Sequence, residues 1–151
     1  MLQRFEDFVT GITVCYKYIQ RIKSAEMTEL GLKGTHVMCL FYLHHNPQGL
    51  TAAQLCQLCA EDKAAISRTL VTLQEKGYIQ TGEKKYRFPL RLTPEGTALA
   101  TQLDGLIQQW VGFGGDGLTD EARASFYRTL SLIAENLHQK LEQATPAEGA
   151  Y

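Results

Sequence analysis

The chain has 151 residues and a mass of 16.9 kDa, which suits one ordinary domain and leaves no room for a two-domain enzyme. Hydrophobic residues make up 44% of it, enough for a packed core and too many for a chain that is disordered throughout. No apolar run reaches the roughly 18 residues of a membrane-spanning helix, and charged residues between Arg4 and Lys23 interrupt any signal-peptide segment. We therefore expect a cytoplasmic protein, without membrane contact, whose four cysteines are reduced thiols.

The charged residues are unevenly distributed along the chain, although the net charge is only −1. Residues 63–92 contain seven basic and two acidic side chains, whereas residues 93–151 contain three basic and eight acidic ones. A basic segment of this kind is expected where a small protein surface meets a polyanion.

The first third of the chain predicts two helices. Apolar residues recur every three or four positions between Phe5 and Ile22, which indicates an amphipathic helix that fades over residues 24–34. A second helix is predicted to begin at a Thr35 cap and to end before the Asn-Pro pair at 46–47, because the residue before proline disfavours helical backbone.

The middle of the chain predicts two short helices joined by a tight turn. Thr51 is expected to cap the first of them, and Gln54, three residues later, completes a capping box. The break at residues 60–62 is long enough only for a turn, and Asp62 is a suitable cap for the second helix. Gly77 suits the left-handed position that ends a helix.

The rest of the chain predicts a hairpin and two more helices. Apolar and basic residues alternate over residues 85–92, which indicates a strand that can pair with residues 78–81 across a charged tip. Thr93 is expected to cap a helix that the glycines of residues 112–117 break. These glycines match the G-x-G-x-x-G pattern, but a helix precedes them, so we expect a loop and not a dinucleotide site. Residues 119–141 predict a last helix with a near-heptad apolar stripe.

A helix pair followed by a basic-tipped hairpin has the layout of a winged helix-turn-helix, whose second helix enters the DNA major groove. A rotation of about 100° per residue from the buried Ile66 places Arg68 on the opposite face, where its guanidinium can reach guanine. The helix start beside Lys63 suits a phosphate. The predicted DNA-binding residues are Thr51, Lys63, Ala64, Ser67, Arg68, Thr72, Lys84, Lys85 and Arg87. The alternatives are that this face is only a solvated surface, or that the module is a protein-interaction scaffold without DNA binding.

The segment from Leu50 to Ile79, LTAAQLCQLCAEDKAAISRTLVTLQEKGYI, closely resembles the helix-turn-helix of MarR-family transcriptional regulators, and LRLTPEGTALA resembles that family's passage from the wing into a dimerisation helix. The resemblance implies an obligate homodimer that binds inverted-repeat operators, represses transcription and is often released by a small effector. It also matches Ser67 and Arg68 to the family's recognition-helix Ser-Arg pair. The wing departs from the family's pattern, because Lys84, Lys85 and Tyr86 stand where the family usually has an Asp-x-Arg motif at the wing tip. The positive charge is kept, so we expect the wing to contact phosphates, but without the support of that Asp–Arg pair.

The expected fold is mostly α with a small β-hairpin wing, in one MarR-like domain over residues 1–151. Residues 35–93 form the winged helix-turn-helix DNA-binding domain, and residues 1–30 and 94–143 form N- and C-terminal dimerisation helices. The helices at the two ends cannot both bury their apolar faces against the small winged-helix unit, which favours a homodimer. We expect no catalytic activity and no cofactor.

Other residues suggest weaker alternatives. Cys15 lies on the helix that peroxide-sensing members of the family use, but residues 33–37 lack the tyrosines that hold the thiolate in those members. A thiol enzyme built on Cys56 and Cys59 would lack a partner base, and these cysteines fit core positions. His36, His44, His45 and Cys39 surround the second helix without a complete ligand set, so no metal site is expected. A small apolar or aromatic effector could bind near aromatic residues that also suit the core, namely Phe41, Tyr42 and Trp110.

Overall fold

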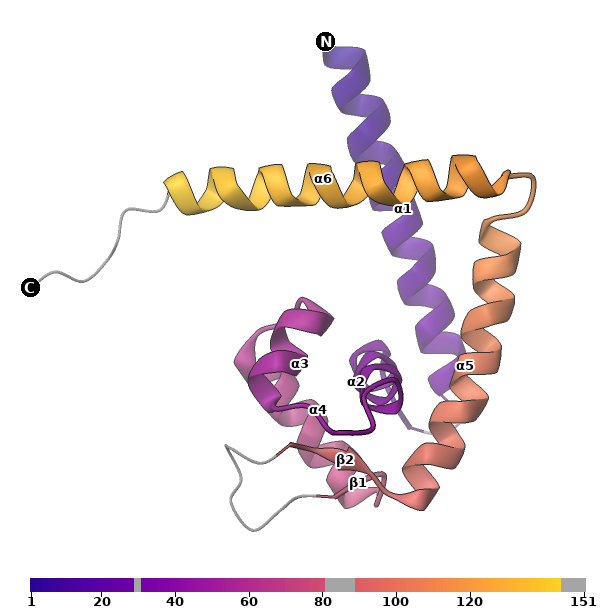
Figure 1. The fold of residues 1–151 in the computed structure, drawn as a ribbon, viewed down its shortest axis with the longest axis vertical. Helices are drawn as coiled ribbons and strands as arrows, with labels where there is room; N and C mark the ends of the chain where they lie inside the picture. The colour runs from indigo at the N-terminus through magenta and orange to yellow at the C-terminus, as the bar shows by residue number, and fades with distance from the viewer. Residues whose placement is uncertain (29–30, 81–88, 145–151) are drawn as a thin grey trace, which may run out of the picture. The chain divides into compact units, whose positions relative to one another are not determined.

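The computed structural model describes residues 1–28, 31–80 and 89–144. Their fold is mostly helical with a short antiparallel hairpin, as predicted (Figure 1). The elements in chain order are α1 (Leu2–Met27), α2 (Gly34–His44), α3 (Ala52–Cys59), α4 (Lys63–Glu75), β1 (Ile79–Gln80), β2 (Arg91–Leu92), α5 (Pro94–Gly114) and α6 (Asp120–Ala144). The chain divides into two compact units, residues 1–107 and 108–151, which are described separately.

The core of the first unit is built around α2, which contacts α1, α3, α4 and β2. Cys39 and Leu40 of α2 are completely buried, together with Leu55 of α3 and Leu73 of α4. Side chains from both flanks of α2 are buried because neighbouring helices cover them, so this helix lacks the single apolar stripe of a surface helix. This packing fixes the positions of the two helices that follow it.

A small sheet closes the other end of this core. Ile79 of β1 pairs with Leu92 of β2 in antiparallel register, and a bridge between Leu50 and Leu90 joins the sheet to the segment before α3. Two backbone hydrogen bonds form that bridge, from the Leu50 amide to the Leu90 carbonyl (3.1 Å) and from the Leu90 amide to the Leu50 carbonyl (2.8 Å). The predicted hairpin thus has its base in the described residues, and its tip lies outside them.

One predicted helix start was wrong, and one helix is longer than expected. Helix α1 ends at Met27, within the predicted fading region, and this last residue is anchored in the core. Helix α2 is capped at Lys33 and not at Thr35, because the Lys33 amide donates to Nδ1 of His36 (2.7 Å) and encloses Thr35 in the first turn. Helix α5 continues through Gly112 to Gly114, since a helical glycine costs only about 1 kcal/mol and does not by itself end a helix.

The second unit contains the end of α5 and all of α6. Gly117 adopts a positive φ of 78° in the turn, and the Thr119 hydroxyl accepts a hydrogen bond from the Ala122 amide (3.2 Å), which begins α6 as predicted. Arg123 donates from Nη2 to the Gly115 carbonyl (3.2 Å) and thereby links α6 to the preceding turn. Among the helices of the described residues, none is long and apolar enough to cross a membrane.

Candidate nucleic-acid interface

The turn between α3 and α4 sets the position of α4. Ala60 ends α3 in the left-handed conformation (φ 53°, ψ 42°), and the Glu61 amide donates back to the Cys56 carbonyl (3.1 Å). The Asp62 carboxylate then accepts a hydrogen bond from the Ala65 amide (2.7 Å) and caps α4. The tight turn and the Asp62 cap that the sequence predicted are therefore confirmed.

One face of α4 is held in the core. Ile66, Thr69 and Leu73 are buried, and Leu70 packs half-buried beside them. The sequence did not identify Thr69 as a core residue, because periodicity alone does not distinguish a buried threonine from one at the surface. Its burial places the core face slightly to one side of Ile66 and leaves the opposite face unchanged.

The opposite face of α4 is exposed to solvent. The predicted contact residues Lys63, Ala64, Ser67 and Arg68 are exposed, and so is Val71 on the same face. Thr72 is only half-buried, and its hydroxyl donates to the Arg68 carbonyl (3.2 Å) within the helix. A long cationic side chain thus lies on a surface of small side chains, which gives a groove-binding helix close access to a polyanion.

Thr51 performs the capping role that the sequence predicted. Its hydroxyl accepts from the Gln54 amide (3.2 Å), and its own amide donates to Oε1 of Gln54 (2.8 Å). The hydroxyl also donates to the same Gln54 oxygen (3.0 Å). Both functions of the hydroxyl are therefore used inside the capping box, so a phosphate contact from Thr51 would compete with the cap.

The predicted wing contacts Lys84, Lys85 and Arg87 lie outside the described residues. At the base of the hairpin, the exposed Arg91 donates from Nε to the Gln48 carbonyl (3.2 Å) and joins β2 to the loop before α3. Arg91 was not among the predicted contacts, although it belongs to the alternating basic face of that strand.

The weaker candidate residues belong to different elements of the chain. Phe41 and Tyr42 of α2 are half-buried, with their rings edge to face at a centroid distance of 5.3 Å. Trp110 belongs to the separately described second unit, where its ring lies 6.1 Å from that of Phe113. Cys15 is exposed on α1.

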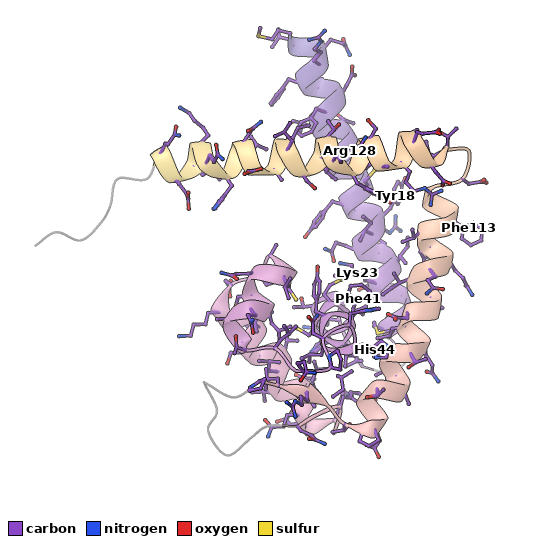
Figure 2. The ribbon with its side chains drawn as sticks, in the orientation of Figure 1. Tyr18, Lys23, Phe41, His44, Phe113 and Arg128 are labelled. Carbon is purple, nitrogen blue, oxygen red and sulfur yellow. The ribbon has the colours of Figure 1, made fainter. Side chains whose placement is uncertain are left out.

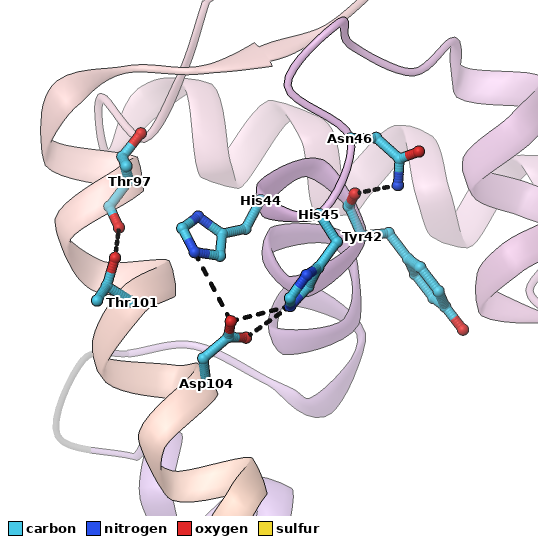
Figure 3. Close-up of polar contacts among 7 residues, drawn as sticks. All are labelled: Tyr42, His44, His45, Asn46, Thr97, Thr101 and Asp104. Atoms are coloured by element: carbon cyan, nitrogen blue, oxygen red, sulfur yellow. Dashed lines mark hydrogen bonds and ion pairs between the residues drawn. The ribbon is translucent and has the colours of Figure 1, made fainter.

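Two of the histidines contact an acidic side chain, as Figure 3 shows. Nε2 of His45 lies 2.9 Å from Oδ2 of Asp104, and Nε2 of His44 lies 3.7 Å from the same oxygen. The contact joins the end of α2 to α5, and periodicity gave no signal for it. Within the described residues no group of three metal-ligating side chains is suitably placed to hold a metal ion.

Comparison with known proteins agrees with this geometry. The MarR family model matches residues 30–85. A MarR protein from Peptoclostridium difficile has a TM-score of 0.80 at 17% identity, with 92% of each chain covered. The transcriptional regulator SlyA has a TM-score of 0.80 at 20% identity, covering 92% of this chain and 99% of its own. A MarR-family protein from Listeria monocytogenes, complexed with 26-mer DNA, has a TM-score of 0.79 at 21% identity, covering 95% of this chain and 97% of its own.

Comparison with curated proteins gave no match. The family model and the solved structures nevertheless agree on the segment and on the fold. The predicted resemblance is therefore confirmed: residues 30–85 match the MarR family model, and the chain is similar in fold to solved MarR-family transcriptional regulators.

Proposed function

We propose that this chain is a sequence-specific DNA-binding regulator that acts as a homodimer on inverted-repeat operators. The observation that carries the proposal is the exposed face of α4, where Arg68 stands among Ala64, Ser67 and Val71. These small neighbours let the helix approach base edges, and a guanidinium can donate to both O6 and N7 of guanine. The DNA in the complex of the Listeria monocytogenes protein supports the same class of partner.

The apolar surfaces of α1 and α6 support the dimer. Phe5 of α1 is 65% exposed, and Phe126 and Leu137 of α6 are 53% and 55% exposed. A two-fold partner would cover such surfaces and would present two α4 helices to half-sites about 34–36 Å apart. Sedimentation at micromolar concentration is expected to give about twice 16.9 kDa, and a monomer under these conditions would contradict the dimer.

The regulatory direction follows from the family resemblance. We propose that the bound dimer represses transcription by occupying the operator in the cytoplasm, and that a small apolar or aromatic effector relieves the repression. The half-buried Phe41 and Tyr42 supply aromatic surface of the kind that such an effector would contact.

A salt titration of two arginine variants tests the central assignment. Arg68→Ala is expected to cost about 1–3 kcal/mol on the preferred operator and to reduce the preference for it over random DNA. Arg128→Ala removes the same charge from an exposed position on α6 and serves as the control, provided that sedimentation shows the dimer intact. If both variants bind operator and random DNA as the parent protein does, the protein-interaction scaffold replaces this proposal.

Substitutions in the wing should affect DNA binding differently from substitutions in α4. We expect Lys84 and Lys85 to contact phosphates, so replacing both with alanine should weaken operator and random DNA alike. The plot of log affinity against log salt should become flatter by roughly 0.9 for each lost phosphate contact. If this variant changes sequence preference while Arg68→Ala changes only the salt slope, the two roles are reversed.

A further inference from the structure

Two cysteines that are far apart in the sequence lie side by side in the first unit. Sγ of Cys39 on α2 is 3.9 Å from Sγ of Cys59 at the end of α3. Cys39 is completely buried, whereas Cys59 is half-buried. In the sequence, the cysteine nearest to Cys59 is Cys56, three residues before it. Only the packing of α2 against α3 brings the Cys39 and Cys59 thiols together.

Cys59 also lines a pocket, which gives it access to small solutes. The pocket has a volume of about 160 Å³, and its walls come from α1, the start of α2 and the turn after α3. Lys23, which Figure 2 labels on α1, is one of the lining residues and supplies a cation beside the thiol. The complete lining is Tyr16, Gln20, Lys23, Gly34, Thr35, Met38, Cys59, Ala60 and Glu61.

The surroundings give the two sulfurs different properties. The hydrogen bond from the Cys39 thiol is the largest influence on the pKa of Cys59 and lowers it, outweighing burial and the Glu61 carboxylate, which raise it; the Lys23 ammonium adds a smaller lowering effect. The same hydrogen bond, together with burial, raises the pKa of Cys39. Cys59 is thus suited to be the thiolate nucleophile, and Cys39 is suited to be the resolving thiol that reacts with it afterwards.

We propose that Cys59 and Cys39 form a redox site in which a hydroperoxide oxidises Cys59 and Cys39 resolves the product into an intramolecular disulfide. The Cys59 thiolate attacks one peroxide oxygen, the O–O bond breaks, and the second oxygen leaves and is protonated as an alcohol, or as water for hydrogen peroxide. Cys59 is then a sulfenic acid. The Cys39 sulfur attacks it, the S–O bond breaks, and the departing hydroxide leaves as water with the Cys39 proton. Two thiols and one hydroperoxide thus give one disulfide, one alcohol and one water.

Closure of the bridge changes the helix-turn-helix. A disulfide needs a separation of about 2.05 Å between sulfurs, so the atoms now at 3.9 Å must approach by about 1.9 Å. Cys39 is enclosed on all sides in α2, so the movement falls mainly on the end of α3, which packs directly against α4. We expect the oxidised protein to bind its operator more weakly; this consequence rests on the proposed function, whereas the bridge does not.

The bridge is tested by treating the reduced full-length protein with a few equivalents of hydrogen peroxide, trapping free thiols with N-ethylmaleimide and mapping peptides without reduction. Residues 34–62 contain no lysine or arginine, so chymotrypsin, which cuts after Phe41 and Tyr42, is needed to separate the two cysteines. The expected result is one disulfide joining Cys39 to Cys59. A Cys56–Cys59 bridge, a bridge between chains, or no bridge would overturn the proposal.

Variants keep the test informative. Cys56→Ser should retain the bridge, because Cys56 lies on the same helix as Cys59 and is not the resolving thiol. Cys39→Ser keeps a hydroxyl that can donate to Cys59 but cannot form a disulfide, so it should stop at a Cys59 sulfenic acid that dimedone labels, and a melting curve should show that this variant is folded. Absence of that label in folded Cys39→Ser would refute Cys59 as the attacking thiolate.

DNA binding is measured on the same samples. At least tenfold weaker operator binding is expected from the bridged protein and full recovery after dithiothreitol. If the disulfide forms but operator affinity is unchanged, the proposed effect on DNA binding is overturned, while the proposed disulfide site stands. Failure of the reduced protein to bind DNA would instead count against the proposed function, because the mapping of the bridge does not depend on DNA.

Discussion

Gly96 in the first turn of α5 offers a sharp test of how the wing is joined to the rest of the first unit. An added Cβ at this position would overlap the backbone carbonyl oxygen of Tyr78 and would lie 2.8 Å from its carbonyl carbon and 3.1 Å from its Cα. The same Tyr78 carbonyl accepts a hydrogen bond from the Thr93 backbone amide (3.0 Å). The Thr93 hydroxyl in turn accepts a hydrogen bond from the Gly96 backbone amide (3.0 Å). Backbone atoms cannot rotate away as a flexible side chain does, so Gly96→Ala must displace β1 or the start of α5.

The expected size of the effect combines two opposing terms. Replacing a helical glycine with alanine normally stabilises by about 1 kcal/mol, because alanine restricts the unfolded chain. Overpacking a fixed core typically costs about 1–3 kcal/mol, and an overlap with backbone belongs at the upper end of that range. We therefore expect Gly96→Ala to lose about 2 kcal/mol, which for a chain of this length lowers Tm by roughly 4–8 °C.

Gly105→Ala is the matched control. Gly105 lies in the same helix and is exposed, and apart from its own helix backbone no atom of the described residues lies within 4 Å of the position where a Cβ would be placed. This variant should gain about 0.5–1 kcal/mol from helix propensity alone. The assay is urea unfolding followed by circular dichroism at one fixed protein concentration, because a dimer's apparent stability depends on concentration. If Gly96→Ala is as stable as Gly105→Ala, the close approach to Tyr78 is refuted.

Three further predictions concern single residues. Ala60→Gly should raise the free energy of unfolding by about 1 kcal/mol in the same urea assay, because Ala60 occupies the left-handed region (φ 53°) that costs a side chain energy; a loss would contradict this. Burial lowers the pKa of His36 from its ordinary 6.5, so the unfolded chain takes up a proton first and stability falls as the pH drops below 6.5. In His36→Gln, which can still accept from the Lys33 amide, unfolding measured from pH 7.5 to 5 should depend less on pH; an unchanged slope would show that His36 is not responsible. Cys15→Ser should leave any response of DNA binding to hydroperoxide unchanged, because the proposed site consists of Cys39 and Cys59 and Cys15 is exposed on α1; loss of the response in this variant would restore Cys15 as the sensor.

Much of the local structure could be predicted because its interactions span four residues or fewer. The Thr51–Gln54 capping box and the Asp62 cap each join groups three residues apart, so the sequence itself contains both partners. The exposed position of Arg68 follows in the same way from helical periodicity and the burial of Ile66. The MarR-family resemblance rested on this same continuous segment, which is why it was visible without any tertiary information.

The sequence therefore determined the helix pair, its caps and the face of α4 that is turned to solvent. Only the tertiary structure decided which distant groups meet: Cys39 with Cys59 and His45 with Asp104. It also decided that Lys33 and not Thr35 caps α2, because both residues precede the same apolar run and only the folded backbone brings the Lys33 amide onto His36. The physical reason is that contacts between elements depend on how whole helices pack, and their helix-long apolar faces do not specify which side chains will be neighbours.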